Sequence, residues 1–200
     1  MSTVVTPPKR ILIVQGHPDG DPARLCRGLA DAYAEGAAEA GHELRRIDLA
    51  TLDFPLLRSQ SAYEKEPIPA VLEPAVEAIR WADHLVFVFP LWLGTMPALL
   101  KGFLEQVLRP GGAFLYLEEA GPQSLLAGKT ARLIVTMGMP SLLFRLWYRA
   151  HGIAAMRRNI LGFVGIRVVR QSLFGMVTAA RDETRRGWLD QIRSAGRRGN

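Results

Sequence analysis

Cysteine is nearly absent from this chain: its 200 residues include one, Cys26. A lone thiol cannot form a disulfide within the chain, so the fold does not need an oxidising compartment. Long hydrophobic runs are missing too, because the longest uncharged run, 85–100, is shorter than the roughly 20 apolar residues of a membrane-spanning helix. Residues 1–9 lack the apolar core of a signal peptide, and we expect them to be a flexible lead-in. These absences together predict a cytoplasmic protein.

Several functional motifs are missing as well. The loop after the first predicted strand contains neither G-x-G-x-x-G nor a Walker A sequence, which argues against a dinucleotide fingerprint and against an NTPase. Four histidines and one cysteine show no metal-ligand spacing, so we expect no metal site.

Charge is distributed unevenly along the chain. Residues 1–100 hold 9 Lys and Arg against 13 Asp and Glu, whereas residues 101–200 hold 16 against 6. A basic half of this kind could attract nucleic acid, anionic lipid or a phosphate-bearing cofactor. Because no nucleic-acid motif accompanies the arginines, and several have the spacing of solvated helix faces, we expect a basic surface and no nucleic-acid partner.

Apolar runs of strand length alternate with segments of helical periodicity, which is typical of a parallel sheet covered on both faces. The sequence predicts strands at 11–14, 42–49, 85–89, 132–136 and 166–173, with the most polar, 42–49, at an edge. It predicts helices at 22–40, 70–81, 97–108, 142–158 and 181–195, with 50–67 as a loop. Asp21 should cap the first helix and Gly41 should end it.

Five strands joined by right-handed crossovers favour a flavodoxin-like open sheet in the order 2-1-3-4-5. The alternative, the full dinucleotide-binding fold, needs six strands. The sequence therefore predicts one α/β domain over residues 10–200, with helices on both faces of the sheet.

Ligands of such folds bind at the carboxyl ends of the strands, where three loops are expected: 15–22, 89–102 and 136–140. The first loop precedes a helix, whose free N–H groups and dipole favour an anion. The second places apolar side chains beyond the end of its strand, where the core stops, and such a surface suits a flat heteroaromatic ring. The third is a glycine-containing turn that lets the backbone approach a ligand closely. The three loops together predict a binding site.

The segment FPLWLGTMPALLKG at 89–102, with PGGAF at 110–114, is similar to the flavodoxin-fold NAD(P)H:quinone oxidoreductases. That family includes the DT-diaphorase-type enzymes and the ancillary oxidoreductases of bacterial potassium-efflux systems. The resemblance runs from about residue 10 to residue 174. It is supported by Gly16-His17-Pro18, Tyr63, Thr136-Met137-Gly138 and His151-Gly152.

The resemblance implies a bound flavin, FAD or FMN, lying across the three loops. It implies that the isoalloxazine ring contacts Pro90, Leu91, Trp92 and Leu93, and that its pyrimidine edge contacts Thr136, Met137 and Gly138. It implies that the phosphate contacts His17 and the start of the first helix, which is Arg24, Leu25 and Cys26.

The sequence departs from the family pattern in two places. The usual Ser-Phe-Asn at the start of the first helix is replaced by Arg24-Leu25-Cys26, and we expect Arg24 to serve as the charge partner of the phosphate. The family's Tyr and His have no copy at the usual spacing, but Tyr148 and His151 would share a face of one helix. We therefore expect both to be catalytic, with His151 offsetting charge on the reduced flavin. The alternative is that His151-Gly152 only ends a helix.

Cys26 has two interpretations. A thiol in the first turns of a helix can be reactive, but no histidine lies near it in the sequence. A small packed side chain is the better interpretation.

The resemblance implies that NAD(P)H delivers a hydride to the flavin and leaves, and that a quinone-like acceptor then takes its place. It also implies a homodimer. Two other functions stay open: a flavin-binding regulatory subunit that docks on a membrane transport partner through the basic half, and a one-electron carrier. True flavodoxins have a Ser/Thr-rich phosphate loop and an acidic surface, and this chain has neither.

Overall fold

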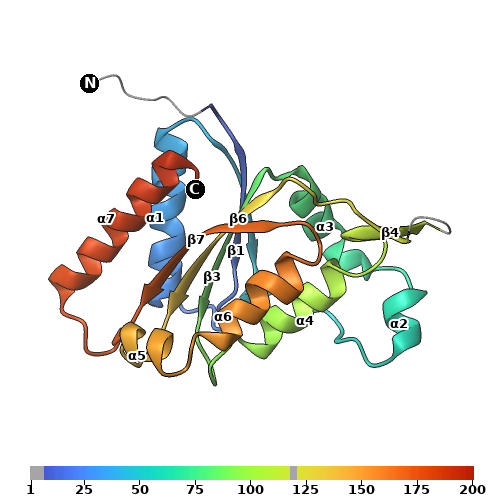
Figure 1. The fold of residues 1–200 in the computed structure, drawn as a ribbon. Coiled ribbons are helices and arrows are strands. Elements are labelled where there is room, and N and C mark those ends of the chain that lie inside the picture. The colour runs from blue at the N-terminus through green and yellow to red at the C-terminus, as the bar shows by residue number, and fades with distance from the viewer. Residues whose placement is uncertain (1–6, 118–120) are drawn as a thin grey trace.

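A computed structural model describes residues 7–117 and 121–200. In this part of the chain five parallel strands form one sheet in the order β2-β1-β3-β6-β7 (Figure 1), which is the predicted 2-1-3-4-5 order. The strands are β1 (Arg10–Gln15), β2 (Glu43–Asp48), β3 (His84–Pro90), β6 (Thr130–Thr136) and β7 (Arg167–Phe174). The flavodoxin-like fold is thus confirmed, with the polar strand β2 at an edge. Most of the predicted lead-in, residues 1–6, lies outside the described residues.

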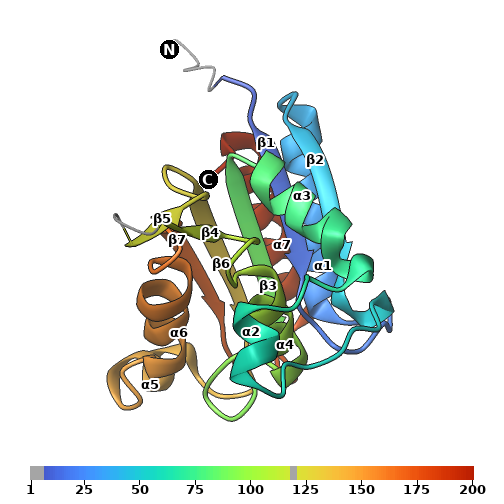
Figure 2. The same cartoon turned by 90° about the vertical axis from the view of Figure 1, so that its right-hand side faces the viewer.

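Helices cover both faces of the sheet, as Figures 1 and 2 show. One face carries α1 (Leu25–Glu39) and α7 (Asp182–Arg198), and the other carries α3 (Glu73–Trp81), α4 (Ala98–Val107) and α6 (His151–Ala155). Successive strand residues point to opposite faces, so Ile11 and Ile13 pack with α1 and α7, while Leu12 and Val14 pack on the other side. Burial on both faces explains why the central strands are continuous apolar runs.

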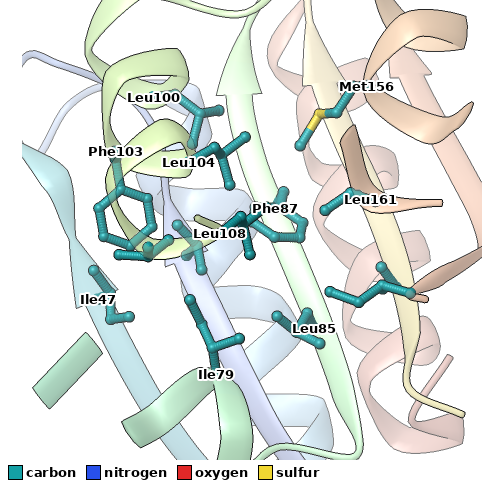
Figure 3. Close-up of a cluster of buried hydrophobic side chains, with 14 of the residues drawn as sticks. Ile47, Ile79, Leu85, Phe87, Leu100, Phe103, Leu104, Leu108, Met156 and Leu161 are labelled. Carbon is teal, nitrogen blue, oxygen red and sulfur yellow. The ribbon is translucent and has the colours of Figure 1, made fainter. Parts of the chain in front are cut away.

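The core on the α3–α4–α6 side is the larger of the two (Figure 3). Phe87 from β3 lies among Leu104 and Leu108 from the α4 region and Met156 and Leu161 from the segment after α6. This cluster fixes α4 and the α6 segment against the sheet, and both elements follow loops at its carboxyl edge.

The backbones of α1 and α7 approach too closely for side chains at two glycines. A Cβ on Gly36 would lie 1.9 Å from the carbonyl oxygen of Arg193, and a Cβ on Gly196 would lie 2.1 Å from that of Tyr33. The helix pair is therefore held at a distance that only glycine allows at these positions.

Gly196→Ala is expected to lower the free energy of unfolding by about 1–3 kcal/mol, because the added methyl group forces the helices apart. Gly187→Ala in the same helix is the control, since a Cβ there meets nothing within 4 Å. Alanine should be neutral or stabilising at that position, by up to about 1 kcal/mol. Chemical denaturation measures both changes, and equal stability of the two variants would contradict the close helix contact.

Two predicted features near the first helix are wrong in detail. The helix α1 begins at Leu25 rather than at residue 22, and Asp21 does not cap it. The Asp21 carboxylate instead accepts a hydrogen bond from the N–H of Ala23, 2.9 Å away, in the turn before the helix. Asp21-Pro22 is a common turn sequence as well as a common helix start, and here the turn forms. Gly41 follows the helix with a φ of +77°, as predicted.

The predicted loop 50–67 contains an element that the sequence did not show, α2 (Gln60–Glu64). None of its residues is buried, so it has no apolar periodicity to reveal it. The end of the segment 50–67 is held in place by the buried Arg109, whose guanidinium donates hydrogen bonds to the carbonyl oxygens of Glu66 and Pro67. A second missed feature is the antiparallel hairpin of β4 (Phe114–Leu117) and β5 (Gly121–Ser124).

The predicted helix 142–158 is wrong, because the chain breaks in its middle. Arg149 and Ala150 have φ values of 49° and 48°, in the left-handed region that ends a helix. The segment consists of α5 (Ser141–Leu146), α6, and a π-helical stretch, η3 (Met156–Leu161). The break changes the position of both predicted catalytic side chains.

Candidate functional site

The loops predicted to form the site lie together at the carboxyl edge of the sheet, the lower edge in Figure 1. The ring of His17, in the loop after β1, meets the ring of Trp92, in the loop after β3, edge to face at a centroid distance of 5.9 Å. The N–H of Leu91 donates a hydrogen bond of 2.7 Å to the carbonyl oxygen of Thr136 at the end of β6. The structure therefore brings residues of all three loops into contact.

The loop after β3 turns back on itself at Trp92–Thr95. The N–H of Trp92 donates to the carbonyl oxygen of Thr95 at 2.9 Å, and the reverse bond measures 3.0 Å. The two central residues, Leu93 and Gly94, have φ values of 47° and 82°, as in a type I′ turn. Leu93 is fully exposed and Trp92 is 48% exposed. A leucine held at positive φ with its side chain in solvent is a strained feature of the kind that gathers at binding sites.

Helix α6 packs directly against the backbone of this turn. A Cβ on Gly152 would lie 2.1 Å from the carbonyl oxygen of Gly94 and 2.8 Å from the Cα of Thr95. Only glycine permits this contact. The sequence marked Gly152 through the family resemblance alone, and nothing in the sequence pairs it with a turn some sixty residues earlier.

The loop after β1 is organised around Asp19. The N–H of Asp19 donates to Nδ1 of His17 at 3.0 Å, and its carboxylate accepts from Nε of Arg24 at 2.7 Å. A hydrogen bond from the N–H of Asp21, followed by that from Arg24, lowers the pKa of the Asp19 carboxyl. Arg24 is thus already paired with carboxylates, and the pair is exposed enough to exchange for another anion.

His17 has a defined protonation pattern. Partial burial lowers the pKa of its imidazole, so the neutral form predominates at neutral pH. Because Nδ1 accepts the bond from Asp19, the proton of the neutral ring lies on Nε2. An N–H donor is therefore available next to the Trp92 ring.

Cys26 is a packed side chain, which was the favoured interpretation. It is 2% exposed, its Sγ lies 3.2 Å from Oγ1 of Thr136, and burial raises the pKa of its thiol to about 11. A thiol with that pKa is not a nucleophile at neutral pH. The contact between Cys26 and Thr136 fixes the start of α1 against the end of β6. The preceding residue, Leu25, is half-buried. Direct contacts of Leu25 and Cys26 with a ligand stay predictions.

The loop after β6 exposes Gly138 and Pro140. Met137 is buried, and its N–H donates to the carbonyl oxygen of Phe174 on β7 at 2.8 Å. Gly138 is exposed, and a Cβ on it would meet nothing within 4 Å. A ligand can approach the backbone at Gly138.

Tyr148 and His151 do not share a helix face, because the break at 149–150 separates them. Their backbones remain linked, since the N–H of His151 donates to the carbonyl oxygen of Tyr148 at 3.3 Å. His151 begins α6 rather than ending a helix, so the capping alternative is also wrong. Both side chains are exposed, and their catalytic role stays a prediction.

Two further searches of the described residues bear on the class of site. In the ranges 7–117 and 121–200, no three His, Cys, Asp or Glu side chains are arranged to hold a metal ion. No described helix combines the length and the apolar character that crossing a bilayer requires.

Residues 9–195 match a family described by its flavodoxin-like fold, and the chain belongs to this family. The match covers every strand of the central sheet and the loops that form the candidate site.

Individual relatives agree with the resemblance found in the sequence. The ribosyldihydronicotinamide dehydrogenase-like protein traD of Penicillium crustosum is 29% identical over 76% of this chain and 64% of its own length. An FMN-dependent NADH:quinone oxidoreductase of Shewanella amazonensis is 27% identical over 78% of this chain and 82% of its own. The solved NAD(P)H:quinone oxidoreductase from Methanothermobacter marburgensis matches with a TM-score of 0.75 and 27% identity, over 95% of this chain and 96% of that one. The chain spans less than two thirds of the first of these proteins. The resemblance to the flavodoxin-fold quinone oxidoreductases is confirmed.

Proposed function

We propose that the protein is a flavin-dependent NAD(P)H oxidoreductase that reduces a quinone-like acceptor. The observation that carries this proposal is the meeting of three loops around the exposed Trp92–Leu93 tip, with a neutral His17 beside it. The names of the relatives, NADH:quinone and NAD(P)H:quinone oxidoreductase, support the reaction class.

The residues present fit a flavin. A flat ring needs an apolar surface and a few hydrogen-bonding groups at its edge. Leu91, Trp92 and Leu93 would supply that surface, whereas Pro90 is buried at the end of β3 and would support the loop beneath it. Gly138 leaves room for the pyrimidine edge. His17 and Arg24, at the start of the first helix, would hold the phosphate. Because the relatives are named FMN-dependent, we favour FMN over FAD, between which the sequence did not choose.

When bound, the flavin accepts a hydride from NAD(P)H and later gives it to the acceptor. The chain has to hold the ring, expose one of its faces and offset charge near its pyrimidine edge. Nicotinamide and acceptor would use the same exposed surface at Trp92 in turn, which is a ping-pong order. His151 lies next to the residue that contacts the Trp92–Thr95 turn, and from there it would donate a hydrogen bond to the reduced cofactor.

Trp92→Ala is expected to weaken retention of flavin on the purified protein by roughly tenfold or more, because stacking on an aromatic ring is lost. Trp81→Ala is the control, since Trp81 precedes β3 at the opposite edge of the sheet and contacts Arg45. Titration with FMN followed by flavin fluorescence measures both. A protein that takes up neither FMN nor FAD would contradict the proposed function itself.

The two rival functions differ from this one in a turnover assay. An enzyme consumes NAD(P)H with a soluble quinone without any other protein, whereas a regulatory subunit or a one-electron carrier does not. We also propose a cytoplasmic location, since the single cysteine, Cys26, is buried and unpaired and the fold uses no disulfide that would need an oxidising compartment.

We expect a homodimer in solution. The segment 50–67 buries little, Leu56 and Phe163 are exposed, and isologous pairing is the commonest arrangement of soluble oligomers. Light scattering should give twice the chain mass of 22.1 kDa at micromolar concentration. A particle of 22.1 kDa with full activity would contradict this expectation.

A further inference from the structure

The segment 141–150 exposes several large apolar side chains to solvent. Phe144 is its one buried side chain, while Leu146 and Trp147 are 71% and 78% exposed. We call the exposed apolar residues of this segment the α5 patch: Leu142, Leu143, Leu146, Trp147 and Tyr148. Single exposed leucines are ordinary, but five large apolar residues in seven consecutive positions indicate a surface that binds something.

The stretch of sequence that contains the α5 patch is basic and lacks acids up to Asp182 and Glu183, which begin α7. Residues 121–181 contain nine Lys and Arg and no Asp or Glu. Arg145, Arg149 and Arg157 line one shallow cavity of 240 Å³. In the described parts of the chain these three guanidinium groups make no ion pair, whereas Arg24, Arg27 and Arg193 elsewhere all pair with carboxylates.

The combination of exposed apolar and basic side chains indicates what kind of partner the α5 patch binds. Leucine, tryptophan and tyrosine side chains flanked by arginine are typical of segments that lie in the interface of a bilayer with anionic headgroups. A second copy of this chain is a poorer partner. An isologous contact through the α5 patch would bring the arginine clusters of both copies together with no acid in 121–181 to compensate.

The patch also lies beside the candidate site. Figures 1 and 2 show α5 at the same edge of the sheet as the loop after β3. The helix that follows it, α6, contacts the Trp92–Thr95 turn through Gly152. A surface that rests on the α5 patch would therefore be close to the exposed Leu93.

We propose that the α5 patch docks the protein on anionic lipid bilayers, and that the acceptor is a quinone dissolved in that bilayer. The docking follows from the α5 patch and its arginines alone, whereas the nature of the acceptor rests on the proposed function. Leu93 and Trp92 then face the lipid from which the acceptor arrives.

Sedimentation with vesicles tests the docking. The full-length protein should bind vesicles of phosphatidylcholine with phosphatidylglycerol at least tenfold more tightly than vesicles of phosphatidylcholine alone, and salt should weaken the binding. Trp147→Ser and the double variant Arg145→Gln/Arg149→Gln should each lower binding about tenfold. Arg186→Gln, an exposed arginine of α7, is the control and should bind like the parent. Equal binding to both vesicle types, or binding unaffected by these variants, would overturn the docking.

A second outcome would also overturn the proposed docking on lipid bilayers. If Trp147→Ser dissociated a dimer in light scattering while vesicle binding stayed unchanged, the α5 patch would be a contact between copies. Melting curves of the variants should match the parent, because all the substituted side chains are exposed.

Turnover assays test the nature of the acceptor independently of the binding to vesicles. With a water-soluble quinone, parent and patch variants should turn over at the same rate. With a long-chain quinone carried in anionic vesicles, the parent should exceed the variants by about tenfold. Normal docking with no such difference would overturn the membrane acceptor alone. No turnover with the soluble quinone would instead count against the proposed function and leave the docking result standing.

Discussion

Gly152→Ala is expected to lower flavin retention and quinone turnover by roughly 100-fold, since a displacement of about 1 Å in a site can cost that much. The added methyl group would lie 2.1 Å from the carbonyl oxygen of Gly94 and 2.8 Å from the Cα of Thr95. Both are backbone atoms, so the Trp92–Thr95 turn has to move as a unit. The Trp92 ring and the exposed Leu93 move with it.

The measurement is a flavin titration together with steady-state turnover and a melting curve. Gly187→Ala again provides the matched control, because its Cβ meets nothing within 4 Å. A Gly152→Ala protein that binds flavin and turns over like the parent would show that α6 does not position the turn. A protein that melts lower but turns over normally would give Gly152 a role in stability only.

His151→Gln is expected to slow reduction of the bound flavin by NAD(P)H by about 10²–10⁴-fold, the usual range for a positioned proton donor. Flavin binding should change much less, because the proposed role of His151 concerns charge that appears only on the reduced cofactor. Its place beside Gly152, which contacts the Trp92–Thr95 turn, is the structural reason for assigning it this role. Stopped-flow bleaching of the flavin absorbance measures the rate.

The competing explanation for His151 is a structural one. His151 is exposed and begins α6, so a purely structural role predicts a small loss of stability and an unchanged rate of reduction. Tyr148→Phe should be compared in the same assay, since it removes only the phenolic hydroxyl and leaves the backbone bond from the N–H of His151 to Tyr148 intact. A normal rate in both variants would move the charge-offsetting role to the backbone at Gly138.

The central sheet could be predicted because its strands carry their own burial pattern. In β3 every residue is buried, and in β1 and β6 all but the first residue are buried. Each therefore contains an apolar run, although Gln15 in β1 and Arg132 in β6 are also buried. Parallel connections then place the loops after these strands at one edge, whatever the details of packing. The loops 15–22, 89–102 and 136–140 were found by that argument, and the structure brings them into contact.

The misplaced elements are those without a local signal. The break at Arg149-Ala150 uses two residues that favour helices, and their left-handed φ values appear only in the structure. The short α2 buries nothing, so no periodicity marks it. Asp21-Pro22 satisfied the rule for a helix start but formed a turn.

The sequence by itself determined the order of strands, the edge at which the site forms, and the apolar character of the Trp92–Leu93 tip. These properties depend on periodicity and on the direction of the chain, which neighbouring residues encode. Only the tertiary structure decided that Gly152 supports the Gly94 turn and that Gly196 admits Tyr33 of α1. It also decided that His17 meets Trp92 and that Tyr148 and His151 separate. Such contacts join residues distant in the chain, and they are set by how closely backbones pack.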